Sequence, residues 1–348
     1  MLSEKEENRT ELNELGEFGL IDLLTDGITL VNPSSIKGVG DDAAVIDNSG
    51  FRTLVSTDLL VEGVHFDLMY TPLKHLGYKA AVVNFSDMAA MNAEPKQIVV
   101  GIAVSNRFSV EALEAFYEGL RLACTQYQVD LVGGDTTSSK SGLFISITVI
   151  GQAATDQVCY RGGAGESDLI CVSGDLGGAY MGLLLLEREK AVFKADPSVQ
   201  PDLDGFDYVL SRQLKPEARM DVVAALREAG VRPTSMIDIS DGLASELLHL
   251  SKASALGCRI YEPKIPIDPT TVRVAEEFGM APAVAALNGG EDYELLFTVS
   301  QADFEKIRHI ESISIIGHMT ANTGEVAMVT TDDQLIPLKA QGWDGLKQ

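Results

Sequence analysis

The stretch from Gly38 to Val45 reads Gly-Val-Gly-Asp-Asp-Ala-Ala-Val and places two aspartates directly after a glycine turn. Shortly afterwards Ser56-Thr57-Asp58 puts a third aspartate at the end of the run Thr53-Leu54-Val55. Carboxylates at the ends of elements can converge, and hard divalent cations prefer such oxygen ligands. Several cations in one site are typical of phosphate chemistry, so this stretch predicts a metal-assisted phosphate site on an α/β scaffold.

Length and charge narrow the class of protein. The chain has 348 residues, of which 45% are hydrophobic, and this length favours two domains over one. The formal net charge is -24, from 27 basic and 51 acidic residues. Nucleic acids are bound through Lys and Arg, so this balance argues against a nucleic-acid partner.

Cysteine usage and hydropathy indicate a cytoplasmic protein. The four cysteines are far apart and form no Cys-x-x-Cys pair, so we expect reduced thiols instead of disulfides or a zinc site. The segment from Met1 to Glu17 is acidic and lacks the order of a signal peptide. No apolar run approaches the roughly 20 residues of a membrane span, so no membrane association is expected.

The chain alternates predicted strands and helices in two sets, each expected to form a sheet with helices on one face. A glycine-rich break at residues 151–165 predicts domains of residues 1–152 and 153–348. Residues 195–207 are rich in Pro and Asp and predict an inserted loop. The other predicted elements are strands at 53–56, 97–105, 128–132, 143–151, 168–173, 235–239 and 291–300, and helices at 73–91, 109–127, 177–189, 221–229 and 241–255.

Seven aspartates in loop or strand-end contexts are candidate metal ligands. A single aspartate after a strand is usually a helix cap or a turn former, but seven beside Gly, Ser or Thr are harder to explain in that way. Asp87 shares a helix stripe with Ala80 and Asn84, where a buried carboxylate would need a partner such as a cation. The candidates are Asp41, Asp42, Asp58, Asp87, Asp135, Asp238 and Asp241.

The usual phosphate-binding loops are absent from the sequence. It contains no Gly-x-x-x-x-Gly-Lys-Ser/Thr element, no dinucleotide glycine fingerprint and no protein-kinase signature. If the protein uses ATP, metal ions must balance most of the phosphate charge, with Arg161 as the main nearby cation. His65, just beyond Ser56-Thr57-Asp58, is a candidate substrate contact. No Ser-His-Asp or Cys-His order supports a covalent nucleophile.

Seven motifs follow one another along the chain. They are Gly16-Glu-Phe18, Gly38-Val-Gly-Asp-Asp42, Ser56 to Phe66, Asn84 to Met91, Gly133-Gly-Asp-Thr136, Ile237 to Leu243, and Gly289 to Leu295. No single motif is decisive, but the seven in sequence are specific. Together they closely resemble the thiamine-monophosphate kinase family of the aminoimidazole ribonucleotide synthetase superfamily, and the resemblance runs from about Gly16 to Trp343.

The resemblance implies a dimer in which the amino-terminal sheets form a barrel across the two-fold axis. Residues 1–152 would bind ATP and magnesium and dimerise, and residues 153–348 would form an α/β domain. It also implies direct transfer of the ATP γ-phosphate to thiamine monophosphate, giving thiamine diphosphate, with several Mg²⁺ ions between the phosphates. Two anionic phosphates repel each other, so multiple cations are also what the chemistry requires.

Site residues are carried over from the family by position. Metal ligands would be Asp41, Ser56, Thr57, Asp58, Asp87, Asp135, Asp238 and Asp241, and the aspartates at 41, 58, 87, 135 and 238 would be catalytic. ATP contacts would be Tyr117, Gly134, Asp135, Arg161 and Ser240, and thiamine contacts His65, Glu291 and Trp343.

The sequence departs from the family at two places. Asn92 stands where glycine is usual, and because asparagine tolerates a left-handed turn, we expect no functional loss. The tail from Gly342 to Leu346 also differs, so the role of Trp343 depends on an atypical segment.

Rival interpretations are a selenophosphate synthetase, a hydrogenase maturation protein, or a non-enzymatic divalent-cation-binding protein. The two enzymes would need a reactive cysteine in the amino-terminal loop or at the carboxyl end, and neither Met1 to Leu24 nor Gly345 to Gln348 contains one.

Overall fold

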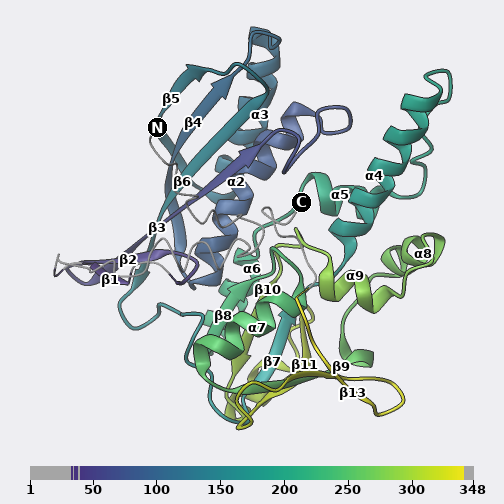
Figure 1. The fold of residues 1–348 in the computed structure, drawn as a ribbon. Coiled ribbons are helices and arrows are strands. Elements are labelled where there is room, and N and C mark those ends of the chain that lie inside the picture. The colour runs from purple at the N-terminus through teal and green to yellow at the C-terminus, as the bar shows by residue number, and fades with distance from the viewer. Residues whose placement is uncertain (1–32, 34, 38–39, 341–348) are drawn as a thin grey trace, which may run out of the picture.

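The computed structural model describes residues 33, 35–37 and 40–340, and within them the chain forms two sheets, each with its own helices (Figure 1). The first sheet has strand order β1-β2-β3-β6-β4-β5, and all its neighbouring strands are antiparallel except β4 and β5. Its strands are β1 (Ser35–Lys37), β2 (Ala44–Asn48), β3 (Phe51–Val61), β4 (Glu94–Val104), β5 (Asp130–Ser138) and β6 (Leu143–Ala154).

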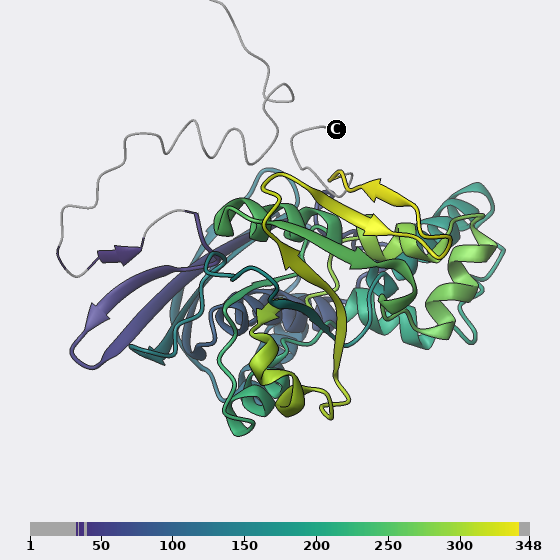
Figure 2. The same cartoon turned by 90° about the horizontal axis from the view of Figure 1, so that it is seen from below.

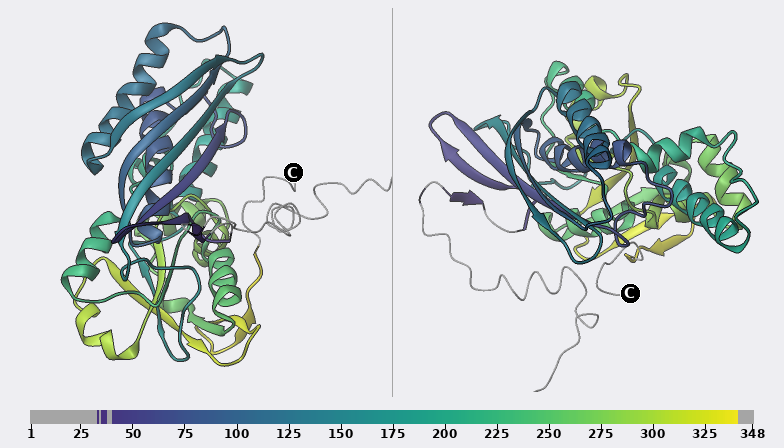
Figure 3. Two further views of the ribbon diagram at one scale, coloured as in Figure 1. Left: turned by 90° about the vertical axis from the view of Figure 1, so that its left-hand side faces the viewer. Right: turned by 90° about the horizontal axis from the view of Figure 1, so that it is seen from above.

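Two helices cover one face of the first sheet, α2 (Leu73–Ala90) and α3 (Val110–Tyr127) (Figure 3). Residues of β6 alternate between buried and partly exposed, as expected for a strand with one covered face. On the opposite face Phe51 and Leu59 of β3 are 55% and 57% exposed. That face is therefore not covered by the described elements.

The second sheet has strand order β13-β12-β9-β11-β7-β10-β8, with β9 and β12 as its parallel pair. Helices α4, α5, α8 and α9 pack together beside it around an apolar cluster that includes Met181, Leu185 and Val209 (Figures 1 and 2). The strands are β7 (Leu169–Ser173), β8 (Ser235–Asp238), β9 (Gly257–Tyr261), β10 (Leu295–Val299), β11 (Ile313–Thr320), β12 (Val326–Val329) and β13 (Leu335–Pro337). The helices are α4 (Gly178–Ala195), α5 (Asp207–Leu214), α6 (Met220–Glu228), α7 (Leu243–Ser254), α8 (Pro269–Glu277), α9 (Pro282–Asn288) and α10 (Phe304–Ile307), with short 3-10 turns at Glu262–Lys264 and Gln301–Asp303.

Helix α2 packs on the first sheet and also contacts β8 of the second. Nearly every residue from Leu76 to Ala90 is buried, so the helix is packed on all sides instead of on one stripe. At its carboxyl end, Ala89 and Ala90 pack in one buried apolar cluster with Val222 and Val223 of α6. Side chains on α2 are therefore held by both halves of the chain.

Several predicted elements match the structure closely, but three strands differ. The strand predicted at 53–56 extends through Asp58 to Val61, and β5 continues through Gly133-Gly134-Asp135 instead of ending there. In both cases ladder pairing with β6 or β4 outweighs the weak strand preference of polar and glycine residues. The strand predicted at 291–300 begins only at Leu295, because residues 291–294 form a loop.

Three further local features agree with the sequence predictions, and one helix is longer than predicted. Asn92 takes a left-handed conformation with φ of 54°, residues 196–206 form a loop between α4 and α5, and all four cysteines are free and buried. Helix α4 extends to Ala195, six residues beyond its predicted end. None of the helices in the described part of the chain has the length and apolarity needed to cross a membrane.

Candidate active site at the junction of the two sheets

Three carboxylates from distant parts of the chain converge where α2 meets the second sheet. Asp42 follows β1, Asp87 lies near the end of α2, and Asp238 is the last residue of β8. One oxygen from each lies within 4.8 Å of the others. The backbone of β8 and the packing of α2 therefore bring together residues up to 196 positions apart in sequence.

Neighbouring side chains orient these carboxylates. Ser56 Oγ donates to Asp87 Oδ2 (2.5 Å), and Ser86 Oγ donates to Asp238 Oδ2 (2.6 Å). Arg161 Nη2 donates to Asp42 Oδ1 (3.0 Å), whereas Asp42 Oδ2 is buried without a hydrogen-bond partner in the described part of the chain. A buried, unpartnered carboxylate oxygen is a position at which a ligand is expected.

Two further aspartates flank the cluster. Asp41 accepts a hydrogen bond from the backbone N–H of Arg161 (3.1 Å), and burial together with the charge of Asp42 raises its pKa to about 6. Asp58 faces α2 from the middle of β3, where its backbone N–H donates to Asn84 Oδ1 (3.3 Å). Burial raises the pKa of Asp58 to about 6.

The charges of the cluster repel one another. Burial, followed by the charges of Asp58, Asp238 and Asp42, raises the pKa of Asp87 well above its ordinary value. Burial and the charge of Asp42 raise the pKa of Asp238 to about 7. Such a site favours either bound protons or bound cations.

The donor set fits a hard divalent cation. All the converging ligands are carboxylate or hydroxyl oxygens, which Mg²⁺ prefers. Oxygens bound to one Mg²⁺ at about 2.1 Å lie at most about 4.2 Å apart, so small side-chain rotations would bring the three carboxylates into one coordination sphere. Asp42, Asp87 and Asp238 are thus the residues best placed to hold a metal.

The raised pKa values predict that the metal-free protein loses stability as pH rises. Between about pH 4 and pH 7 the folded protein binds more protons at Asp58 and Asp238 than the unfolded chain does, because its pKa values are higher. The free energy of unfolding therefore falls as pH rises through this window. Thermal unfolding in EDTA at pH 5 and pH 8 measures the effect, and Asp238→Asn should make the dependence shallower. An unchanged dependence in that variant would contradict the assignment.

A cavity of about 150 Å³ opens beside the carboxylate cluster. His65 and Glu291 are part of its wall, together with the metal candidates Asp58, Asp87 and Asp238. His65 Nδ1 accepts a hydrogen bond from the backbone N–H of Val61 (3.0 Å). The neutral imidazole therefore carries its proton on Nε2. The lining residues are Asp58, Leu59, Leu60, His65, Val83, Asp87, Asp238, Ser240, Glu291 and Tyr293.

The loop from Gly289 to Glu294 holds Glu291 in this wall. A side chain at position 290 would place its Cβ 2.4 Å from Ser240 O, so only glycine permits the close approach of the loop. Asp292 accepts the N–H groups of Gly177 and Ala179 at the start of α4 (2.7 and 3.3 Å). The loop is therefore anchored on both sides of Glu291.

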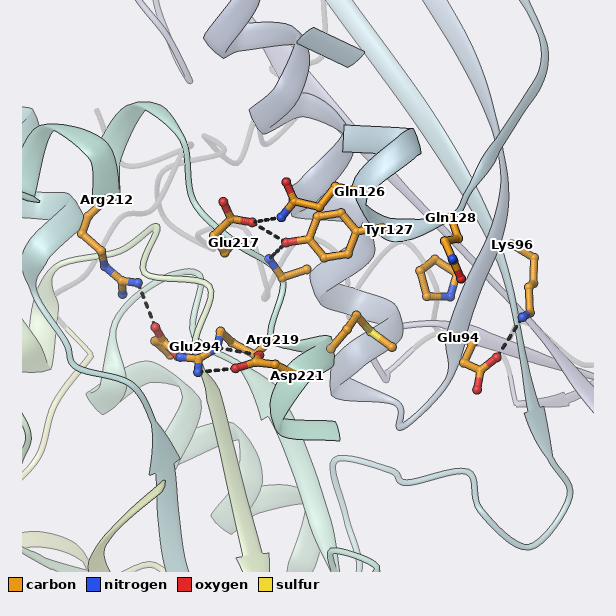
Figure 4. Close-up of a pocket in the computed structure, with 13 residues that line it drawn as sticks. Glu94, Lys96, Gln126, Tyr127, Gln128, Arg212, Glu217, Arg219, Asp221 and Glu294 are labelled. Atoms are coloured by element: carbon orange, nitrogen blue, oxygen red, sulfur yellow. Dashed lines mark hydrogen bonds and ion pairs between the residues drawn. The ribbon is translucent and has the colours of Figure 1, made fainter. Parts of the chain in front are cut away.

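A larger cavity of about 690 Å³ lies between the start of β4 and the segment before α6 (Figure 4). Its charged groups are paired with one another, since Glu294 accepts from both Arg212 (2.8 Å) and Arg219 (2.5 Å), and Arg219 also donates to Asp221. Among the described residues, none of those predicted from the sequence to bind metal, ATP or thiamine lines it. The smaller cavity is thus the one associated with the predicted site.

Other predicted site residues lie outside the group of three carboxylates. Thr57 is on the face of β3 opposite to Ser56 and Asp58, where its hydroxyl donates to Ile147 O (3.1 Å). Gly134 and Asp135 lie on the exposed edge strand β5, and Tyr117 packs against Phe116 on α3. Asp241 precedes α7, and its backbone N–H donates to Glu246 Oε1 (3.1 Å). Trp343 and the motif Gly16-Glu17-Phe18 lie outside the described residues.

Two residues that contact Glu291 in the cavity wall were not predicted from the sequence to belong to the site. Lys79 Nζ lies 2.9 Å from Glu291 Oε1, and Gln213 Nε2 donates to Glu291 Oε2 (2.7 Å). The signal for Lys79 is its position between Tyr78 and Ala80 in an otherwise apolar helical run. A lysine in such a run needs a buried partner. Nothing local in the sequence indicates the role of Gln213.

Comparison with known proteins places the chain in a known class. The model for the N-terminal domain of AIR synthase related proteins matches residues 40–153, which contain Asp41, Asp42, Asp58 and Asp87. Thiamine-monophosphate kinase of Bacillus subtilis (strain 168) is 34% identical over 340 residues, which are 96% of this chain and 100% of that protein. The chain belongs to the thiamine-monophosphate kinase family.

Solved structures agree with this assignment. A structure of AaThiL complexed with AMPPCP and TMP is 32% identical, with a TM-score of 0.83 over 97% of this chain and 99% of that one. Thiamine monophosphate kinase from Aquifex aeolicus is 29% identical, with a TM-score of 0.74 over 94% of this chain and 99% of that one. The two-sheet α/β architecture is thus the AIR synthase-like fold of these enzymes.

Proposed function

We propose that this protein transfers the γ-phosphate of ATP to the phosphate of thiamine monophosphate, giving thiamine diphosphate and ADP. The observation that carries the proposal is the convergence of Asp42, Asp87 and Asp238 beside the cavity that contains His65 and Glu291. Family membership supports the same activity, and the related AaThiL has been solved with AMPPCP and TMP. The rival superfamily enzymes are not favoured by these relatives.

Divalent cations, with Mg²⁺ as the expected ion, would neutralise the repulsion between the two phosphates when bound. The residues proposed to hold them are the oxygen donors Asp41, Ser56, Thr57, Asp58, Asp87, Asp135, Asp238 and Asp241. Asp42 joins this set because its Oδ2 is buried without a partner in the described residues.

The protein's own residues orient the reactants. The acceptor phosphate is already ionised near neutral pH, so the reaction needs no strong general base, and the proposal rests on positioning and charge balance. Arg161, which already binds Asp42, and Ser240, which lines the cavity, are proposed ATP contacts, together with Tyr117, Gly134 and Asp135. His65 and Glu291 are proposed to contact the thiamine moiety.

We also propose a division into residues 1–152 and 153–348, and a dimer in which the first sheets of two copies form a barrel. The uncovered face of the first sheet supports the dimer, because Phe51 and Leu59 are more than half exposed there. A second copy of this sheet would remove these apolar side chains from water.

A coupled assay of ADP release tests the activity directly. With Mg²⁺ and ATP, we expect release of ADP on addition of thiamine monophosphate and formation of thiamine diphosphate, but no release with free thiamine, which lacks the acceptor phosphate. Equal rates with both compounds would overturn the proposed acceptor. Absence of ATP binding in calorimetry would instead favour a non-enzymatic cation-binding protein.

His65→Ala is expected to raise KM for thiamine monophosphate by about tenfold and to leave KM for ATP within about twofold, since His65 lines the cavity beside Glu291. Steady-state kinetics with each substrate varied in turn measure both constants. His309→Ala, at an exposed position of the second half, is the matched control and should leave both unchanged. Equal effects of His65→Ala on both constants would contradict its assignment.

A further inference from the structure

Lys79 is a buried lysine that is paired with Glu291 of the cavity wall and with Gln213, which also holds Glu291. It is 3% exposed on α2, and its Nζ donates to Gln213 O (2.9 Å) and lies 2.9 Å from Glu291 Oε1. Removing an ammonium group from water costs several kcal/mol unless the group is paired. Lys79 itself does not line the cavity.

Glu291 is held at both carboxylate oxygens and at its backbone. Lys79 binds Oε1 from α2, and Gln213 binds Oε2 from α5. The backbone N–H of Glu291 donates to Ser240 O (2.7 Å), and its φ is 67°, a left-handed conformation that a non-glycine residue adopts only when its surroundings hold it. Each oxygen retains a second lone pair, so the fixed carboxylate can still accept hydrogen bonds from a ligand.

The neighbouring charge of Lys79 gives Glu291 a different electrostatic environment from that of the proposed metal-binding carboxylates. Asp58, Asp87, Asp238 and Glu291 all line the cavity, and among the described residues Glu291 is the one of these four with an ammonium group 2.9 Å away. A second cation at Glu291 would be repelled by that group. Glu291 is therefore suited to the organic part of a substrate, whose pyrimidine ring carries an amino group, instead of to a metal ion.

We propose that Lys79 is a positioning residue for the acceptor substrate: it fixes the Glu291 carboxylate in the cavity wall without touching the substrate. This inference rests on the proposed function. A purely structural role is a poorer explanation, because an apolar side chain of similar length would fill the same space without the desolvation cost of a buried ion pair. Gln213 holds the second oxygen of the same carboxylate.

A double-mutant cycle between Lys79 and Glu291 tests the proposal. We expect Lys79→Met to raise KM for thiamine monophosphate by about tenfold, with KM for ATP within about twofold. If Lys79 acts through Glu291, the double variant Lys79→Met/Glu291→Gln should be no worse than Glu291→Gln alone. Lys79→Arg, which keeps the charge, should recover part of the loss.

Lys74→Met is the matched control, since Lys74 lies on the same helix in an ion pair with Glu118 whose side chains are both about half exposed. It should leave both KM values unchanged. If Lys79→Met does not fold, as judged by circular dichroism, Lys79→Gln replaces it in the same cycle, because the amide keeps a donor. Equal effects on both substrates, or losses that multiply in the double variant, would overturn the inference. A wild-type protein inactive on thiamine monophosphate would instead refute the proposed function.

Discussion

Asp87→Asn is expected to lower kcat by about 1000-fold or more, which corresponds to about 4 kcal/mol of transition-state stabilisation. The same substitution should raise the melting temperature of the metal-free protein. Asp87 lies in a cluster with Asp42 and Asp238, and burial and these neighbouring charges raise its pKa well above the ordinary range. An amide of the same shape removes the repulsion but also removes a ligand. Opposite changes in activity and stability are typical of a residue that serves function at the expense of stability.

Turnover under saturating Mg²⁺ and thermal unfolding in EDTA measure the two effects. Magnesium should raise the melting temperature of the wild-type protein more than that of Asp87→Asn, because ligand binding stabilises the folded state. Asp130→Asn, at an exposed position of β5, is the control and should behave as wild type. Activity within tenfold of wild type, or a lower melting temperature in EDTA, would remove Asp87 from the proposed role.

Gly119→Val is expected to lower the free energy of unfolding by about 3 kcal/mol or more, or to prevent folding. A Cβ at Gly119 would lie 1.7 Å from Lys74 O, and one at Gly77 would lie 1.9 Å from Phe116 O. The backbones of α2 and α3 are thus in direct contact, and any side chain at these positions would push the helices apart. Since α2 carries Asp87, activity should be lost together with stability.

Urea denaturation measures this loss. Thr125→Val introduces the same β-branched side chain at an exposed position of α3 and serves as the control. It should change the free energy of unfolding by less than about 0.5 kcal/mol, as is usual for a surface substitution. A stable, active Gly119→Val protein would show that the close approach of the two helices is not needed.

The parts of the fold that follow from local pattern were predictable. Helix α2 was predicted at 73–91 and runs from Leu73 to Ala90, a segment that no proline interrupts. Strand β3 was predicted only at 53–56. Its extension to Val61 was missed because Ser56-Thr57-Asp58 has the composition of a turn, and pairing with β6 keeps these residues extended. The same pairing puts Ser56 and Asp58 on one face and Thr57 on the other, a distinction that needs the strand register.

The candidate site was predictable as a set of residue types but not as a geometry. Convergence of aspartates follows from their positions at element ends, yet which three meet depends on how α2 packs on β8. Lys79 was overlooked because a lysine on a helix is usually solvated. Burial of α2 on all sides, which depends on tertiary structure, makes its pairing with Glu291 necessary.

Anomalous diffraction at the manganese edge, from crystals containing Mn²⁺ and a non-hydrolysable ATP analogue, would locate the bound cations. We expect peaks within about 2.5 Å of carboxylate oxygens of Asp42, Asp87 and Asp238, with the terminal phosphate of the analogue directed toward the cavity containing His65 and Glu291. Fully occupied manganese sites elsewhere in the protein, with no peak among these three carboxylates, would contradict the account.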